Sequence, residues 1–226
     1  MLIHLKNVDS TNNYMEKNAL PAGTIVWADS QTAGRGRGRH SFASPEGGIY
    51  FSCLFKEGKE TSNGHLSPND SNLLTPKAAL AVCMALEEIC GLEPRIKWVN
   101  DVFLEGKKVC GILCEHIGAK YIVGIGINTS VDSLPEELKQ SAGGIGDVPK
   151  RILIKKISEL LFSSMSDADI LSGYSRRLGT LGRMVSFLYE GEERTGTVTG
   201  INESCNLIIQ TDSGIVTLSS GEINMI

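Results

Sequence analysis

The 226-residue chain lacks the sequence features that mark several large classes of protein. No apolar stretch reaches the roughly 20 residues that a membrane-spanning helix needs. Residues 1–6, MLIHLK, lack the apolar core of a signal peptide. The six cysteines form no C-x-x-C pair, and the four histidines complete no zinc-binding pattern. These absences predict a soluble, cytoplasmic protein with reduced thiols and without a membrane partner.

A net positive charge is also missing, because 22 basic residues are outnumbered by 26 acidic ones, which leaves the chain at −4. Domains that bind nucleic acid are normally basic, so we expect no nucleic-acid partner. Apolar residues make up 41% of the chain, which is enough for a substantial core. The length fits one large domain, or a main domain with a small addition.

Three common catalytic and nucleotide-binding motifs do not occur. The chain contains no Walker A sequence and no G-x-S-x-G nucleophile elbow. Residues 124–128, GIGIN, resemble a dinucleotide-binding fingerprint but lack its third glycine and the helix that follows it. We therefore expect neither a P-loop, nor a Rossmann site, nor a hydrolase of the nucleophile-elbow type.

The most informative segment that is present is the run at residues 33–40, AGRGRGRH, in which glycine and arginine alternate. Glycine lets the backbone approach a ligand closely, and the arginine fork matches carboxylate and phosphate oxygens. Disordered RNA-binding tracts have a similar composition. This run, however, lies between two strand-like segments, residues 24–28 and 48–55. That context favours a folded loop that binds a small anion with a phosphate group.

Hydrophobic patterning and turn residues predict alternating strands and helices over the first 178 residues. The predicted strands are 2–8, 24–28, 48–55, 95–99, 102–104, 107–115 and 121–128, and the predicted helices are 13–19, 75–90, 149–165 and 167–178. Residues 56–72 are polar and rich in turn signals, so we expect a surface loop there. Five short strands follow between residues 183 and 226, with the spacing of a small, partly closed barrel that begins near Gly182.

Residues 97–101, KWVND, end a predicted strand with a cation, an amide and a carboxylate. The Asp101 carboxylate has the chemistry to bind Mg²⁺, and the Asn100 amide can contact phosphate or ribose. An ordinary Asx turn has the same composition. Lys108 is either a solvated hairpin residue or a functional cation. Gly111 lies inside a predicted strand, where glycine often marks the close approach of a ligand or of another backbone segment.

Five motifs occur in the order in which they are found in biotin protein ligases. They are 9–12 (DSTN), 31–37 (QTAGRGR), 97–101 (KWVND), 108–115 (KVCGILCE) and 124–128 (GIGIN). The chain therefore resembles this family, whose members attach biotin to a lysine of a carrier domain, and the resemblance covers nearly its whole length. It implies an α+β fold: a class II synthetase-like catalytic domain with a mixed, largely antiparallel sheet over 1–181, and an SH3-like C-terminal β-barrel over 182–226.

The resemblance also implies which residues act. Biotin would be bound by Ser10, Thr11, Asn12, Gln31, Arg35, Gly36, Arg37, Lys108, Gly111 and Leu113. ATP would be bound by Arg39, Phe42, Asn100, Asp101 and Asn128, with Mg²⁺ on Asp101. The catalytic residues would be Arg37, Lys97, Asp101 and Lys108. The implied substrates are biotin and ATP, and the implied partner is the biotin carboxyl carrier domain of a biotin-dependent carboxylase.

Three positions depart from the family pattern. Val99 stands where proline is usual, and His40 and Phe42 stand where a basic residue and a tryptophan are usual.

Some relatives begin with a DNA-binding repressor domain, which we expect this chain to lack. The sequence leaves open whether the protein forms a homodimer. The alternative functions are a lipoate or octanoyl ligase, a non-catalytic sensor of biotin or its adenylate, and an RNA-binding protein.

Overall fold

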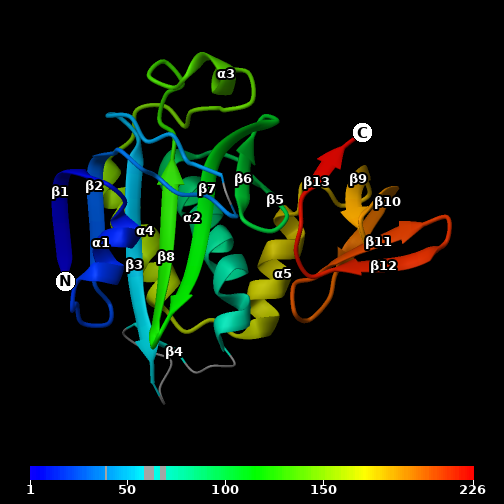
Figure 1. The fold of residues 1–226 in the computed structure, drawn as a ribbon, viewed down its shortest axis with the longest axis horizontal. Helices are drawn as coiled ribbons and strands as arrows, with labels where there is room; N and C mark the ends of the chain where they lie inside the picture. The colour runs from blue at the N-terminus through cyan, green and yellow to red at the C-terminus, as the bar shows by residue number, and fades with distance from the viewer. Residues whose placement is uncertain (39, 59–63, 67–69) are drawn as a thin grey trace.

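The computed structural model describes residues 1–38, 40–58, 64–66 and 70–226. Arg39, a predicted ATP contact, lies outside the described residues, as do 59–63 and 67–69 of the predicted surface loop. Figure 1 shows a large sheet with helices on both sides and a smaller sheet beside it. In the described ranges, no helix has the length and apolar character to cross a membrane.

The larger sheet has eight strands in the order β1-β2-β3-β8-β7-β6-β5, with β4 beside β3. The strands are β1 (Leu2–Val8), β2 (Ile25–Gln31), β3 (Ile49–Glu57), β4 (His65–Leu66), β5 (Arg95–Lys97), β6 (Asp101–Leu104), β7 (Lys107–Ile117) and β8 (Lys120–Ile127). The pairs β1/β2 and β3/β4 are parallel and the others are antiparallel. The predicted mixed, largely antiparallel sheet is therefore confirmed.

Both faces of this sheet are covered, and this explains why the first seven residues of β3 are buried. The helices are α1 (Thr11–Lys17), α2 (Leu74–Cys90), α3 (Glu136–Lys139), α4 (Lys150–Phe162) and α5 (Asp167–Arg177), with a 3₁₀ turn at Asp70–Leu73. Phe51 and Cys53 of β3 belong to the main core, which also contains residues of α2, α4 and α5. Leu54 points the other way and packs with Met15 of α1. Alternate residues of a strand face opposite sides of the sheet, so both sets of positions are buried and mostly apolar, with Ser52 as a buried polar residue among them.

The second sheet is formed by the five strands predicted for the C-terminal region. They are β9 (Met184–Tyr189), β10 (Glu192–Ile201), β11 (Leu207–Thr211), β12 (Gly214–Leu218) and β13 (Ile223–Met225), in the order β12-β11-β10-β9-β13. The expected partial closure into a barrel is wrong. β13 is only three residues long and pairs with β9, so β12 and β13 remain the two edges of an open sheet.

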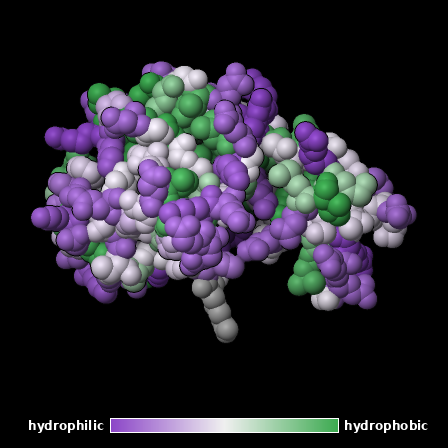
Figure 2. Space-filling model, turned by 90° about the horizontal axis from the view of Figure 1, so that it is seen from above, coloured by the Kyte–Doolittle hydropathy of each residue, from purple (hydrophilic) through white to green (hydrophobic). Residues whose placement is uncertain are grey.

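The two sheets share one buried core. Val185 and Phe187 of β9 belong to the same apolar cluster as residues of α2 and β6. The indole Nε1 of Trp98 donates to the carbonyl oxygen of Cys205 at 2.8 Å. Figure 2 shows the smaller sheet as a separate lobe on which hydrophobic residues gather. The division of the chain into domains at 1–181 and 182–226 stays a prediction.

Candidate functional site

A network of buried polar groups lies where α1 begins beside β2. Ser10, Thr11 and Asn12 are each only 3% exposed. The backbone N–H and the hydroxyl of Thr11 both donate to Oε1 of Gln31, at 2.9 and 3.1 Å. The Gln31 amide nitrogen lies 2.9 Å from the hydroxyl oxygen of Ser44, to which it donates. Two of the predicted motifs therefore meet in one hydrogen-bond network.

Glu115 links three segments that are far apart in the sequence. Its Oε2 atom accepts from Nδ2 of Asn12 at 2.8 Å and from Nη2 of Arg35 at 2.5 Å. The Nε atom of Arg35 is buried and has no hydrogen-bond partner among the described residues. Because an unpaired buried donor costs free energy, this atom is suited to donate to a ligand. Sequence reasoning assigned Glu115 no role, although it ends one of the quoted motifs.

Glycines of β7 and β8 make room for side chains from other segments. Gly111 and Gly126 are cross-strand partners, and a Cβ atom at these positions would lie 3.0 and 2.5 Å from the Phe42 ring. At Gly124, a Cβ atom would lie 2.3 Å from Oδ1 of Asn12. The group that approaches Gly111 is therefore an aromatic side chain, whereas the sequence suggested a ligand or another backbone segment.

Two cations are held in place by polar residues of the KWVND segment. Nζ of Lys108 lies 2.8 Å from Oδ1 of Asp101. Asn100 donates through Nδ2 to the carbonyl oxygen of Ile112 at 2.9 Å, and its Oδ1 accepts from Nη1 of Arg37 at 3.4 Å. The peptide bond between Trp98 and Val99, where the family pattern has proline, is cis.

Three adjoining cavities surround the Phe42 ring, which contributes to the lining of each. The inner pocket, of about 30 Å³, is lined by Ser10, Thr11, Asn12, Gln31, Arg35, Gly111 and Leu113, among others. The central cavity, of about 270 Å³, is lined by Arg35, Gly36, Arg37, Lys97, Asn100, Asp101 and Lys108, among others. The side pocket, of about 110 Å³, is lined by residues that include Lys108, Asn128 and Leu138.

The structure thus brings together the predicted site residues that it describes, with two qualifications. Asn128, a predicted ATP contact, lies in the side pocket and not with Asn100 in the central cavity. Lys97 lines the central cavity, but its ammonium nitrogen lies 5.8 Å from the centroid of the Phe103 ring. Neither position tests the role that the resemblance implies, and these roles stay predictions.

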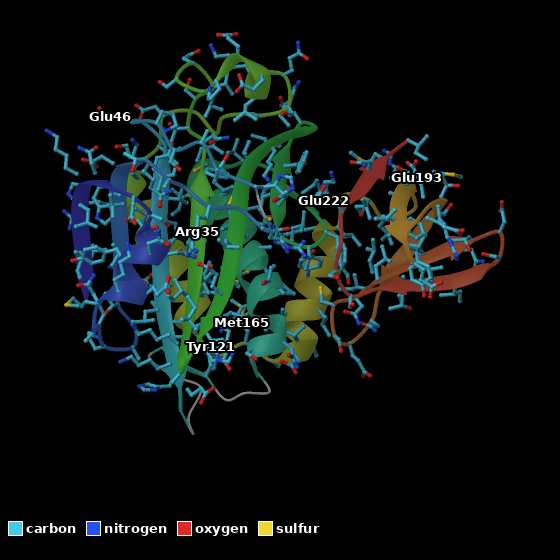
Figure 3. All side chains as sticks on the ribbon, viewed as in Figure 1. Arg35, Glu46, Tyr121, Met165, Glu193 and Glu222 are labelled. Atoms are coloured by element: carbon cyan, nitrogen blue, oxygen red, sulfur yellow. The ribbon has the colours of Figure 1, made fainter. Side chains whose placement is uncertain are left out.

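The Arg-Gly loop contacts neighbouring segments at both ends. At its start, the carbonyl oxygen of Asp9 accepts from the backbone N–H of Ala33 at 2.8 Å. At its end, Nε2 of His40 lies 3.2 Å from Oε1 of Glu222, which precedes β13. Figure 3 shows Arg35 in front of the large sheet and Glu222 on the side of the smaller sheet that faces it. Arg35 and Glu222 line the central cavity from these two sides.

Asp9, the first residue of the DSTN motif, contributes to the start of α1. Its carboxylate accepts from Nδ2 of Asn13 at 3.0 Å and from the backbone N–H of Ser10 at 2.7 Å. These hydrogen bonds, that of Asn13 foremost, lower the pKa of Asp9 to about 2. The carboxylate therefore stays ionised and orders the first residues of α1. The available signal was the position of Asp9 just before the helix, where carboxylates often cap.

Asp101 fits Mg²⁺ only as a partial ligand. The described residues contain no group of three or more His, Cys, Asp or Glu side chains that could hold a metal ion. The Asp101 carboxylate is also paired with Lys108. Mg²⁺ is commonly bound by one or two carboxylates together with substrate phosphates, so phosphate oxygens would have to complete the site. The assignment of Mg²⁺ to Asp101 stays a prediction.

Comparison with known proteins gives consistent matches over the whole chain. Residues 5–132 match the biotin/lipoate A/B protein ligase family, and residues 180–225 match the biotin protein ligase C terminal domain. The bifunctional ligase/repressor BirA of Bacillus subtilis is 30% identical over 98% of this chain and 72% of its own length. The biotin--[acetyl-CoA-carboxylase] ligase of Paracoccus denitrificans is 27% identical over 97% of this chain and 98% of its own.

A solved structure agrees with these matches. The biotin protein ligase from Aquifex aeolicus, in complex with biotin and ATP, superimposes with a TM-score of 0.86. It is 33% identical in sequence, and the alignment covers 100% of this chain and 98% of that one.

Proposed function

The chain belongs to the biotin/lipoate A/B protein ligase family, and we propose on this basis that it is an ATP-dependent biotin protein ligase. It forms biotinyl-5′-AMP from biotin and ATP and then transfers biotin to a lysine of a carrier domain. The observation that supports this proposal best is the arrangement around Phe42, where a polar pocket, a cationic cavity and a side pocket adjoin. The Aquifex aeolicus relative, of the same fold, binds biotin and ATP together.

The ureido ring of biotin is assigned to the inner pocket, because its N–H and C=O groups match the donors and acceptors of Thr11, Asn12 and Gln31. The pocket of about 30 Å³ is smaller than a bicyclic ring system. Binding therefore requires a wall to move. Of the residues that line both this pocket and the central cavity, Arg35 and Phe42 are the candidates because they lie outside the strands of the sheet, whereas Gly111 and Leu113 belong to β7.

The first step joins two anions. An oxygen of the biotin carboxylate attacks the α-phosphorus of ATP, and the bond from that phosphorus to the β-phosphate oxygen breaks, releasing pyrophosphate. Arg37 and Lys108 line the central cavity and supply positive charge where the two anions meet. Electrostatic stabilisation of developing charge and positioning of reactants are the main contributions to such reactions. Asn100 orients Arg37 and Asp101 orients Lys108.

In the second step, the amine of the carrier lysine attacks the acyl carbon of the mixed anhydride. The bond from this carbon to the phosphate oxygen breaks, AMP leaves, and the amine loses a proton as the amide forms. The anhydride must be protected from water in the interval. We assign this role to the Arg-Gly loop, whose described residues line the central cavity and contact the C-terminal region through His40 and Glu222.

The carrier is a biotin carboxyl carrier domain in this proposal, which accords with the names of relatives from Paracoccus denitrificans and Mycobacterium tuberculosis. Mg²⁺ neutralises phosphate charge when bound, and Asp101 and Asn100 would hold it together with ATP. Location in the cytoplasm and assembly into a homodimer stay predictions.

The direct test incubates the protein with biotin, Mg-ATP and a carrier domain, and weighs the intact carrier by mass spectrometry. A carrier with its acceptor lysine changed to arginine is the matched control. A gain of one biotin that requires ATP and the lysine is expected. Binding of biotin without its transfer to the carrier would refute the ligase activity and favour a non-catalytic sensor. A gain with lipoate or octanoate, but not with biotin, would favour the related acyl ligases.

A further inference from the structure

A cavity of about 320 Å³ lies between the β5–β6 hairpin and the C-terminal end of β13. We call it the junction cavity, because the segment that connects α5 to β9 forms one of its walls. Figure 1 shows this region between the two sheets. Its volume is at the lower end of the range for small-molecule sites. It shares Lys97 with the central cavity but contains none of the residues of the inner pocket.

Three cations line the junction cavity: Arg95, Lys97 and Arg183. No carboxylate of the described residues lies within 4.0 Å of any of them. One guanidinium nitrogen of Arg95 donates to the carbonyl oxygen of Arg176 at 3.5 Å, which leaves its other nitrogens available. Glu105 is the acidic side chain in the lining. The side chains of the lining therefore carry a positive charge that the protein does not neutralise at close range.

Thr180 provides a second, independent indication of a ligand. The residue is 1% exposed, and its hydroxyl has no hydrogen-bond partner among the described residues. A buried polar group without a partner costs free energy, so such groups are uncommon in folded proteins. Thr180 lines the junction cavity, and its carbonyl oxygen accepts from the backbone N–H of Arg183 at 3.0 Å. This turn joins the backbone of Thr180 to that of Arg183, one of the three cationic residues.

The remaining wall is apolar. Phe103 contributes an aromatic ring to the lining, and Met225 and Ile226, at the end of β13, are 53% and 75% exposed. Large exposed apolar side chains beside a cationic pocket suit a ligand that combines an anionic group with an apolar one.

We propose that the junction cavity binds a small organic phosphate. Its phosphoryl oxygens accept hydrogen bonds from Arg95, Arg183 and the Thr180 hydroxyl, and its apolar group packs against Phe103 and Met225. The guanidinium fork suits both carboxylate and phosphate. Phosphate is favoured over a single carboxylate because three cations are present and a phosphate monoester carries close to two negative charges. The proposal does not depend on the ligase activity, because the cavity can be probed without biotin or ATP.

The test titrates phenyl phosphate into the protein and follows methyl NMR signals of Thr180 and Met225, with Ile112 as a reporter of the central cavity. Saturable shifts at Thr180 and Met225 are expected, with inorganic phosphate binding at least tenfold more weakly. The double variant Arg95→Gln/Arg183→Gln should weaken binding at least tenfold. The matched control Arg151→Gln, an exposed arginine on α4, should leave it unchanged. Shifts confined to Ile112, or binding that the double variant does not weaken, would overturn the proposal.

Thr180→Val separates a role in ligand binding from a role in folding. Because the hydroxyl has no partner in the free protein, its removal should leave the melting temperature unchanged or raise it, while phenyl phosphate binds about fivefold more weakly or worse. A lower melting temperature with unchanged affinity would show that the hydroxyl serves the fold, and would contradict the proposal.

Discussion

Replacing Gly126 by alanine tests whether the Phe42 ring packs against the glycines of β7 and β8. The added Cβ atom would lie 2.5 Å from a ring carbon, whereas ordinary contact begins at 3.4 Å. The ring must therefore retreat by about 1 Å, and overpacking of this kind typically costs about 1–3 kcal/mol. Alanine recovers about 0.5–1 kcal/mol relative to glycine in a strand. We expect Gly126→Ala to lower the free energy of unfolding by about 1–2 kcal/mol.

The assay is urea-induced unfolding, combined with a mutant cycle and a matched glycine. In a Phe42→Ala background the clash is absent, so Gly126→Ala should raise the free energy of unfolding by about 0.5–1 kcal/mol. The coupling energy then equals the clash itself, about 1–3 kcal/mol. At Gly111, the Cβ atom would lie 3.0 Å from the ring, a much smaller overlap. Gly111→Ala should therefore be close to neutral. Because Phe42 lines all three cavities, Gly126→Ala should reduce the affinity for biotin more than Gly111→Ala does.

Two results would refute this reasoning. One is a cost for Gly126→Ala that persists when Phe42 is alanine, which would place the strain elsewhere. The other is an equal cost at Gly111 and Gly126, which would show that the distance to the ring does not decide the effect.

Three further predictions follow from the site. Arg37→Gly should release biotinyl-AMP and label lysines of bystander proteins, as mass spectrometry of an added bystander would show; an adenylate that stays bound would contradict the role of the loop. Lys108→Ala should reduce the rate of pyrophosphate release at saturating biotin more than it reduces the affinity for biotin. Equal reductions of the rate and of the affinity would contradict a role of Lys108 in the first step. The pKa of Asp9 is lowered from 3.8 to about 2, so its carboxylate stabilises the fold above about pH 4, and this contribution is lost as the pH falls towards 2. Asp9→Asn should flatten the decrease of unfolding free energy over that window, and a variant with an unchanged pH profile would refute it.

Local sequence was sufficient wherever one segment determines its own conformation. Strands were predicted at 102–104 and 107–115, and the two residues between them, Glu105 and Gly106, have positive φ, 50° and 78°, as a tight hairpin requires. A helix was predicted over 75–90, and α2 ends at Cys90, where Gly91 follows as the cap with a φ of 64°. The five C-terminal strands were likewise predicted from turn residues and spacing. These features depend on neighbours within a few residues, which the sequence displays directly.

The resemblance to biotin protein ligases was also readable from the sequence, because the family's motifs keep their order along the chain. Their meeting in space was not readable. Glu115 binds Asn12 and Arg35 across 103 and 80 residues, and no local pattern marks such a contact.

Only the tertiary structure decided which side chain packs against the glycines of β7 and β8, whether the C-terminal sheet closes, and where the junction cavity lies. Gly111 receives the Phe42 ring because β7 and β8 pair in a register that places Gly126 opposite it. The junction cavity needs β5, β6, β13 and the segment after α5 to converge. The physical reason is the same in each case. Short-range propensities act along the chain, whereas pairing register, packing and unpaired buried groups arise only when distant segments are brought into contact.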